Sequence, residues 1–305
     1  MPTIVTTIQT MNMEAVNTKP YKKIDERCLL CFKNTYQGLF DKFNLTTVQR
    51  LTFMVFFEQS VLSHNISKPV ELQQILNQKF CEIIMIKDPY EKEKIKSNKQ
   101  ALKLLKKWEP IVTASENPFD LALRLSIAGN IMDYGANNKF NISDTIHEVI
   151  HAPFAINHAE LLKNEIIKAQ SILYIGDNAG EIVFDKLFIK TCLKNKKVFY
   201  AVRGCPVLND ATKDDADIIK MEEVAEVISN GNGAPSTLLN KCCYDFKKIY
   251  NEADLIISKG QGNLEGLITE KNPKIFFLLM IKCNVISELL GVEKGRFVVV
   301  KQKGY

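Results

Sequence analysis

Two kinds of hydrophobic periodicity divide this chain of 305 residues. From about residue 28 to about residue 150, apolar residues return every three or four positions, which predicts amphipathic helices. After about residue 160 the pattern changes to short apolar runs rich in β-branched and aromatic residues, separated by helical segments. The sequence therefore predicts a helical first part followed by alternating strands and helices.

The fold class follows from the order of these elements. Alternating strands and helices are typical of a mostly parallel sheet covered by helices on both faces. We predict an α/β fold in which a helical N-terminal region packs on a three-layer α/β/α sandwich with a mostly parallel sheet. The predicted division is a loose extension over 1–20, a helical region over 21–160 and a Rossmann-like α/β/α region over 161–305. Helices are expected at 28–43, 46–62, 70–84, 91–108 and 117–135, and strands at 171–176, 197–202, 254–260, 274–280 and 297–302.

Composition and charge narrow the possible partners. Hydrophobic residues make up 46% of the chain and charged residues 25%, which is ordinary for a globular protein. The net charge of +5 is spread over 40 basic and 35 acidic residues without a dense basic block, so nucleic acid is not an expected partner. No signal peptide and no uninterrupted apolar run of about 18 residues is present, so we expect a cytoplasmic protein without a membrane partner. The sequence leaves the oligomeric state open.

Polar residues stand directly after the first expected strand, 171–176. Asp177, Asn178 and Glu181 lie there, followed by the start of a helix. In parallel sheets, ligands bind beyond the carboxyl ends of the strands. Carboxylate and amide oxygens suit Mg²⁺ or Mn²⁺, and a helix N-terminus favours an anion. The alternative is that Asp177 or Asn178 simply caps the helix.

Two further strand ends carry polar residues. The strand at 197–202 is followed by a cation, an amide and an acid, and the strand at 254–260 ends in a lysine and a Gly-rich turn. Such turns can cradle phosphate oxygens, although an ordinary tight turn explains this motif when it is taken alone. Together, the three strand ends predict a divalent metal beside a phosphate pocket, which suits phosphoryl transfer. The residues concerned are Arg203, Asn209, Asp210, Lys259, Gly260, Gly262 and Asn263.

Six motifs occur in a fixed order along the chain: "CLLC", "AGNIMDYG", "GDNAGEIVFDKL", "RGCPVLNDAT", "ISKGQGNLEGL" and "FFLLMIKC". With them the chain resembles the metal-dependent damage-control phosphatases, once known only as a domain of unknown function, in the branch with an N-terminal CxxC motif. The resemblance extends from Cys28 to about Val300. It implies a helical part against an α/β/α sandwich, and hydrolysis of small phosphorylated metabolites such as damaged sugar phosphates.

The resemblance also implies roles for particular residues. One divalent ion, Mn, Co, Ni or Mg, would be held by Asp177, Asn178 and Asp210, with Lys259 on the substrate phosphate. Asn130 and Asp133 are three residues apart and share one helix face, where they either end the helix or face the site, and the resemblance favours the site. The substrate or phosphate contacts that we expect come from Lys259, Gly260, Gly262, Asn263, Arg203, Asn209, Asn130, Asp133 and Glu181.

Some alternatives stay open at this point. Cys28 and Cys31 offer two thiolates, not the four ligands of a structural zinc, so inert thiols, a redox pair and a metal site all remain possible. A methyltransferase of similar sheet topology and a non-enzymatic metal-binding or metabolite-binding protein are the competing functions. The oxygen-rich ligand set favours the phosphatase, because methyl transfer needs no divalent metal. It also predicts that the two cysteines are not required for phosphoryl transfer.

Overall fold

The computed structural model describes residues 24–62, 66–129 and 149–303 of the chain. Within these residues seven strands form one sheet in the order β1-β7-β6-β5-β2-β3-β4. All neighbouring strands are parallel except β6 and β7. The predicted α/β fold with a mostly parallel sheet is therefore confirmed. The strands are β1 (Ile156–Asn157), β2 (Ser171–Ile175), β3 (Lys197–Val202), β4 (Glu226–Ser229), β5 (Leu255–Lys259), β6 (Ile275–Met280) and β7 (Phe297–Lys301).

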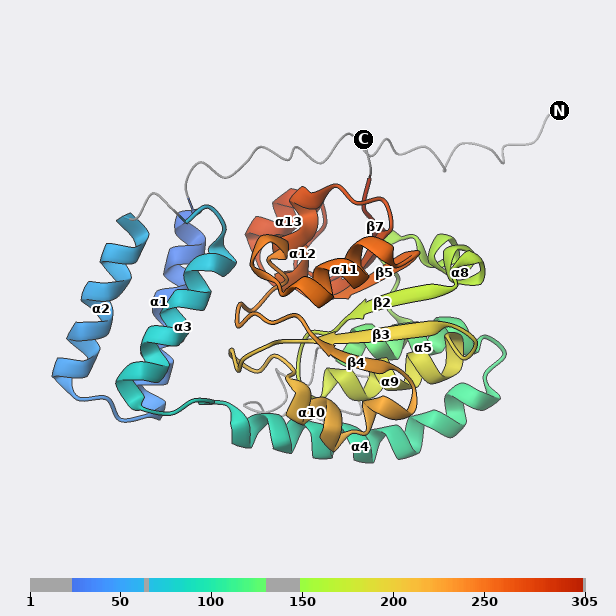
Figure 1. The fold of residues 1–305 in the computed structure, drawn as a ribbon, viewed down its shortest axis with the longest axis horizontal. Helices are drawn as coiled ribbons and strands as arrows, with labels where there is room; N and C mark the ends of the chain where they lie inside the picture. The colour runs from blue at the N-terminus through green and yellow to red at the C-terminus, as the bar shows by residue number, and fades with distance from the viewer. Residues whose placement is uncertain (1–23, 63–65, 130–148, 304–305) are drawn as a thin grey trace.

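Helices cover both faces of the sheet and form a separate group at one end (Figure 1). In Figure 1, α11, α12 and α13 lie above the sheet, α4, α5, α9 and α10 lie below it, and α1, α2 and α3 stand together on the left. The helices are α1 (Glu26–Lys42), α2 (Thr47–Leu62), α3 (Pro69–Ile84), α4 (Glu91–Ala114), α5 (Pro118–Ala128), α8 (Ala159–Lys168), α9 (Glu181–Cys192), α10 (Lys213–Ile218), α11 (Tyr244–Glu252), α12 (Gln261–Leu267) and α13 (Asn284–Leu290).

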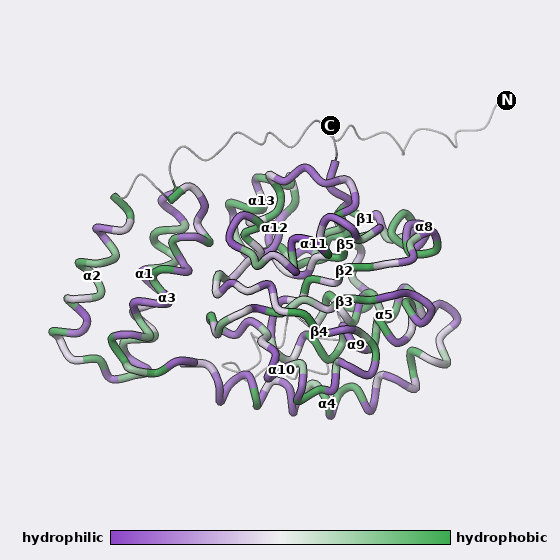
Figure 2. Tube along the Cα trace, viewed as in Figure 1, coloured by the Kyte–Doolittle hydropathy of each residue, from purple (hydrophilic) through white to green (hydrophobic). Residues whose placement is uncertain are grey.

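The alternation of side chains along the strands produces two cores, one on each face of the sheet. In β2, Ile172 and Tyr174 join the core under α5 and α9, whereas Leu173 and Ile175 join the core under α11 and α12. This is the period of two expected for a strand, here with apolar residues on both faces because both faces are covered. The hydropathy colours alternate along α4, as expected for a helix with one buried face (Figure 2).

A third core holds α1, α2 and α3 together. Its centre is a cluster of rings from Tyr36, Phe40, Phe53 and Phe80, with ring centroids 4.5–6.4 Å apart. Rings at these distances and tilts add to the stabilisation that burial gives. The group also contacts the rest of the chain, because Gln74 donates to Asn232 at 2.7 Å and the Lys68 ammonium donates to the carbonyl of Gly266 at 2.7 Å.

Candidate active site at the strand ends

The loops after β2 and β3 are hydrogen-bonded to each other. The amide of Ala211 donates to the carbonyl of Asp177 at 2.8 Å, and the amide of Ala179 donates to the carbonyl of Asn209 at 2.9 Å. Between these bonds, Asn178 and Asp210 form an isolated antiparallel bridge. Residues that are 32 or 33 positions apart in the sequence are thus held together at the carboxyl edge of the sheet. Asp177, Asn178 and Asp210 are all buried.

Arg203 joins the two acids of this edge. Its Nε donates to Oδ2 of Asp210 at 2.6 Å, and its Nη2 lies 3.5 Å from Oδ1 of Asp177. Its Nη1 donates to Oδ1 of Asn263 at 3.0 Å, which connects the loops after β2 and β3 to α12. Nη2 has no hydrogen-bond partner although it is buried. One donor of the guanidinium is therefore available to a ligand at the acids.

Burial raises the pKa of Asp177, and the positive charges of Lys282, Arg203 and Lys259 only partly oppose this shift. A buried carboxyl with a raised pKa lacks full charge compensation, which a divalent cation would supply. The donor set of two carboxylates and one amide consists of the hard oxygens that Mg²⁺ and Mn²⁺ prefer. Among the residues that the structure describes, no group of three or more His, Cys, Asp and Glu side chains could hold a metal, so the amide of Asn178 is needed to complete this set.

The Gly-rich turn after β5 owes its glycines to close packing. Gly260 has φ +80°, and a Cβ there would lie 1.9 Å from Oδ2 of Asp177. A Cβ on Gly262 would lie 2.2 Å from the carbonyl oxygen of Pro235. Asn263 donates to the carbonyls of Lys259 at 2.7 Å and Gly176 at 3.1 Å, so it fixes the turn against the loop after β2. Glycine at 260 therefore allows the loop that carries Asp177 to pack against this turn. The predicted contacts of the turn with a phosphate stay predictions.

Lys259 lies beneath the acids with no exposed surface. Its ammonium donates to Oε1 of Glu181 at 2.6 Å, to Oδ1 of Asp185 at 2.7 Å and to the carbonyl of Ser126 at 2.8 Å. These three acceptors use all three of its hydrogens. A contact between Lys259 and a substrate phosphate would require one of these bonds to be exchanged, and this contact stays a prediction.

Asp185 is a central residue of the site that the sequence reasoning missed. Besides the Lys259 ammonium, it accepts hydrogen bonds from the hydroxyls of Tyr174 at 2.8 Å, Tyr200 at 2.8 Å and Ser126 at 2.9 Å. The available signal was its spacing from Glu181, because two acids four residues apart share one face of a helix and the residues between them, 182–184, are all apolar.

Glu181 has fewer hydrogen-bond partners than Asp185. It is 1% exposed, and its Oε2 has no hydrogen-bond partner. Burial raises the pKa of Glu181 to about 8, opposed by Lys259 and reinforced by the charges of Asp177 and Asp185. With one ammonium between two carboxyl groups, a proton on Glu181 leaves the cluster of Lys259, Asp185 and Glu181 without net charge.

The loop after β4, residues 230–238, is a second part of the site that was missed. Oδ1 of Asn230 accepts from the amides of Gly204 at 3.1 Å and Asn232 at 2.9 Å, and Thr237 donates to Oδ1 of Asn263 at 2.9 Å. The loop is thereby fixed between the turn after β3 and α12. The signal in the sequence was "NGNGAPST", a cluster of turn-forming residues.

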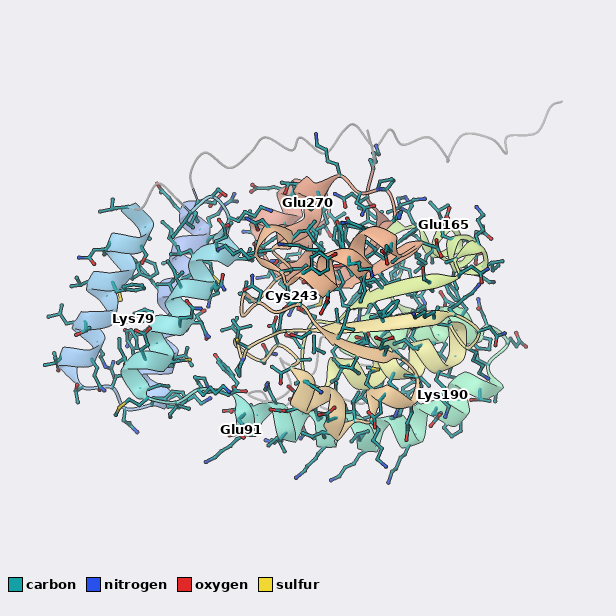
Figure 3. All side chains as sticks on the ribbon, viewed as in Figure 1. Lys79, Glu91, Glu165, Lys190, Cys243 and Glu270 are labelled. Atoms are coloured by element: carbon teal, nitrogen blue, oxygen red, sulfur yellow. The ribbon has the colours of Figure 1, made fainter. Side chains whose placement is uncertain are left out.

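A cleft of about 530 Å³ lies beside the loops after β2 and β3, which carry Asp177, Asn178 and Asp210, although these three residues do not line it. Ala179 and Asn209, which neighbour the acids in the sequence, form its floor, and residues of α1 and α4 form its walls. Figure 3 shows Glu91, at the start of α4, on the side that faces α1–α3, whereas Lys190 on α9 lies far from it. Asn130 and Asp133, predicted to contact substrate, lie outside the described residues.

Cys28 and Cys31 lie on α1, and Cys28 packs against the core of α1–α3. Burial raises the pKa of Cys28 to about 12 and also raises the pKa of Cys31. At neutral pH the free thiol of Cys28 therefore stays protonated, which makes it a poor nucleophile.

Comparison with known proteins gives consistent results. Residues 24–298 match the family model of the damage-control phosphatase ARMT1-like domain. A damage-control phosphatase from Archaeoglobus fulgidus is 32% identical over 247 residues, which cover 78% of this chain and 85% of that protein. The damage-control phosphatase PH1575 from Pyrococcus horikoshii is 33% identical over 222 residues, which cover 71% of this chain and 75% of that protein. The crystal structure of this DUF89 family protein superposes with a TM-score of 0.84 at 29% identity, over 92% of this chain and 99% of that chain. Among the described residues, no helix is both long and apolar enough to span a membrane.

Proposed function

Because this chain belongs to the ARMT1-like family of damage-control phosphatases, we propose that it is a divalent-metal-dependent hydrolase of small phosphate monoesters, with damaged sugar phosphates as the substrate class. The single observation that carries the proposal is the pairing of the loops after β2 and β3. This pairing brings Asp177, Asn178 and Asp210 together, buried, at the carboxyl edge of the sheet, and their sequence neighbours Ala179 and Asn209 line a cleft.

In this proposal Asp177, Asn178 and Asp210 hold one ion, Mn, Co, Ni or Mg. When bound, such an ion neutralises phosphoryl oxygens and lowers the pKa of water. Arg203 contacts both acids, through the hydrogen bond from its Nε to Asp210 and the ion pair of its Nη2 with Asp177, so it keeps them fixed in the absence of substrate. Phosphoryl transfer depends mainly on positioning the reacting groups and on stabilising the developing negative charge. In this proposal the metal ligands and Arg203 contribute to both.

The buried cluster of Lys259, Glu181 and Asp185 supports this edge from beneath. Asp185 keeps the Lys259 ammonium in place, and the ammonium fixes one oxygen of Glu181. The other oxygen of Glu181 has no partner. At neutral pH it belongs to a carboxyl group that still holds its proton, because burial raises the pKa of Glu181 to about 8. Glu181 is thus a candidate to hold a proton near the phosphate.

Release of inorganic phosphate from a panel of phosphate esters tests the proposal, with the metal removed and then restored as Mn²⁺, Co²⁺, Ni²⁺ or Mg²⁺. We expect turnover only with metal, and none from Asp177→Ala at limiting metal. A matched control is Asp254→Ala, because Asp254 precedes β5 at the opposite edge of the sheet, where it accepts from the amides of Gln170 and Ser171 at 2.9 Å. That variant should keep its turnover per folded molecule.

Metal binding also has a readout that is independent of turnover. A ligand that binds only the folded chain stabilises it by about 2.7 kcal/mol at a concentration of 100 Kd. The metal should therefore raise the melting temperature of the wild type and of Asp254→Ala, but not that of Asp177→Ala. Turnover that persists in a chelator, or in Asp177→Ala, would refute the metal-dependent mechanism. Metal binding without any phosphate release would favour a binding protein.

A further inference from the structure

The buried face of α4 changes from polar to apolar along the helix. Its buried residues are Lys94, Asn98, Ala101, Trp108 and Val112. The first two are polar and lie one helical turn apart, whereas the last three are apolar and belong to the core under α5 and α9. Asparagine is a weak helix former, and a buried amide is costly unless it is hydrogen-bonded. Packing alone would therefore favour an apolar residue at position 98.

Asn98 has no exposed surface and contacts two segments that are far from it in the sequence. Its Oδ1 accepts from the amide of Gly180 at 2.7 Å, and its Nδ2 donates to Oδ1 of Asp215 at 2.9 Å. Gly180 lies two residues after Asn178, at the start of α9. Asp215 lies five residues after Asp210, in α10. One side chain of α4 therefore connects the segment after β2 to the segment after β3.

Asp215 extends this connection toward the acid of the loop after β3. Its Oδ2 accepts from the amide and from the hydroxyl of Thr212, at 2.9 Å each, and from the Lys94 ammonium at 2.9 Å. Thr212 lies two residues after Asp210. Lys94 also pairs with Asp88 at 2.9 Å. Burial by itself would lower the pKa of Lys94, but Asp215 and Asp88 raise it overall, so the side chain stays an ammonium at neutral pH.

From these contacts we infer that Asn98 is a positioning residue, which holds the loops after β2 and β3 in the register that the metal ligands need. Through Gly180 it restrains Asn178, and through Asp215 it restrains the segment that follows Asp210. The backbone hydrogen bonds between the two loops connect them on the side of the acids, and Asn98 connects them a second time on the side of α4. Residues that orient metal ligands in this way typically change the metal affinity by about 10–100-fold when they are removed.

This inference rests on the proposed function, because it takes Asp177, Asn178 and Asp210 as the ligands of a divalent ion. Asn98 itself is not placed among the ligands, since its oxygen and its nitrogen both already have partners in the protein. Its contribution is to the spacing of the ligands, which can be measured without any turnover.

The test measures the Kd of Mn²⁺ by calorimetry in the full chain, for the wild type, Asn98→Ala and Gln73→Ala. Gln73 is a matched control, because it is also a buried amide inside a helix, but its amide donates to the hydroxyl of Tyr36 at 3.2 Å in the core of α1–α3. Both variants should melt below the wild type. We expect Asn98→Ala to raise the Kd at least tenfold and Gln73→Ala to leave it within about twofold of the wild-type value.

Hydrogen exchange of the metal-free chain reads the positions of the loops directly. In Asn98→Ala, amides in 177–180 and in 210–212 should exchange faster than in the wild type, and in Gln73→Ala at the wild-type rate. The double variant Asn98→Asp, Asp215→Asn exchanges the two groups and keeps the net charge. Its carboxylate at position 98 can accept from Gly180 and from the amide at position 215, whose oxygen can accept from Lys94 and Thr212. We expect this variant to restore both the exchange rates and the Kd.

Each result has a distinct meaning. A folded Asn98→Ala variant with the wild-type Kd would overturn the inference and leave the proposed function intact. An equal rise of the Kd in Gln73→Ala would also overturn it, because the loss of affinity would then follow from lost stability in general. The same holds if the double variant has wild-type exchange rates but still binds Mn²⁺ weakly, since the connections would then be present without setting the affinity.

Two further outcomes are covered by the same measurements. If the wild type binds none of Mn²⁺, Co²⁺, Ni²⁺ and Mg²⁺, the proposed function fails, and hydrogen exchange decides the inference: faster exchange of both loops in Asn98→Ala supports it and unchanged exchange refutes it. If Asn98→Ala does not fold, Asn98→Ser takes its place, because its shorter side chain reaches at most one of the two segments. A wild-type Kd in that variant would overturn the inference.

Discussion

Lys259 and its two carboxyl partners form the most constrained group of side chains in the site. None of the three has more than 1% of its surface exposed. Two acids four residues apart on α9 receive the same ammonium, and Asp185 receives three hydroxyl donors in addition. Removal of one member of a buried ionic group leaves the others without compensation, which costs more than the group contributes in total.

We therefore expect Lys259→Met to lower the free energy of unfolding by about 3–5 kcal/mol, the cost of breaking a buried pair from one side. Asp185 and Glu181 would then face each other without a counterion. Denaturant unfolding measures this change, and the double variant Lys259→Met, Asp185→Asn should recover part of the loss, because it removes one of the two opposed acids. A midpoint equal to that of the wild type would show that the ammonium does not support the fold.

At the scale of elements, one face of α1 lines the cleft and another packs in the core of α1–α3. One face carries Thr35, Gly38 and Lys42 to the cleft, another carries Tyr36 and Phe40 into the core of α1–α3, and Leu39 contributes to both. Cys28 also packs against this core. A helix repeats every 3.6 residues, so a sequence of 17 residues can contribute to a core and line a cleft at once.

We expect the double variant Cys28→Ser, Cys31→Ser to keep its metal-dependent turnover per folded molecule and to melt at a lower temperature. A serine hydroxyl at a half-buried position loses the apolar contacts of the thiol and adds a polar group to be solvated. Turnover and thermal melting are to be measured together. Cys81→Ser is a matched control for stability, because Cys81 is a half-buried thiol on α3 whose pKa burial raises to about 11. Loss of turnover in the folded double variant would place the cysteines in the chemistry.

At the scale of the whole molecule, the site is shared between distant segments. The helix α1 provides one wall of the cleft, α4 provides the other, and the loops after β2, β3 and β5 carry the acids and the turn that packs against them. The contact of α3 with the loop after β4, through Gln74 and Asn232, holds the helical group over the strand ends. Global stability and the geometry of the site are therefore linked, and a buried titrating group in the site should influence both.

The pH dependence of unfolding should reveal the proton on Glu181. In the unfolded chain this carboxyl titrates near its ordinary value of 4.5, and in the folded chain its pKa is about 8. Between these values the folded chain holds a proton that the unfolded chain has released. The free energy of unfolding therefore falls as pH rises through this window, by about 1 kcal/mol per pH unit at the steepest point.

Glu181→Gln should remove this component, because glutamine does not titrate. The difference between the wild type and Glu181→Gln isolates it from other groups, among them His158, whose pKa burial lowers and whose contribution has the opposite sign. Urea unfolding at intervals from pH 5 to pH 9 measures the two slopes. Parallel curves for the two proteins would show that Glu181 releases its proton in the folded chain as readily as in the unfolded one.

Local patterns in the sequence determined which segments form the sandwich. The five expected strands are all present, because runs such as "SILYI" and "IFFLLM" are buried on both faces and so are continuously apolar. Two strands of the sheet were not predicted. β1 has two residues, and β4 lies at the edge of the sheet with partly exposed side chains, so neither shows a distinctive apolar run. The expected domain division at residue 160 stays a prediction.

The same local reasoning predicted that Asp177, Asn178 and Asp210 lie at one edge, because strand ends can be located from the sequence and the carboxyl ends of parallel strands share one edge. Their role in binding a metal stays a prediction. Only the tertiary structure decided what each side chain meets. It gave Lys259 three internal acceptors, it brought Asp185 beneath the acids, and it set the face of α1 that carries Gly38 opposite α4. The physical reason is that periodicity reports which face of an element is buried, whereas the partner of that face depends on contacts between residues far apart in the chain.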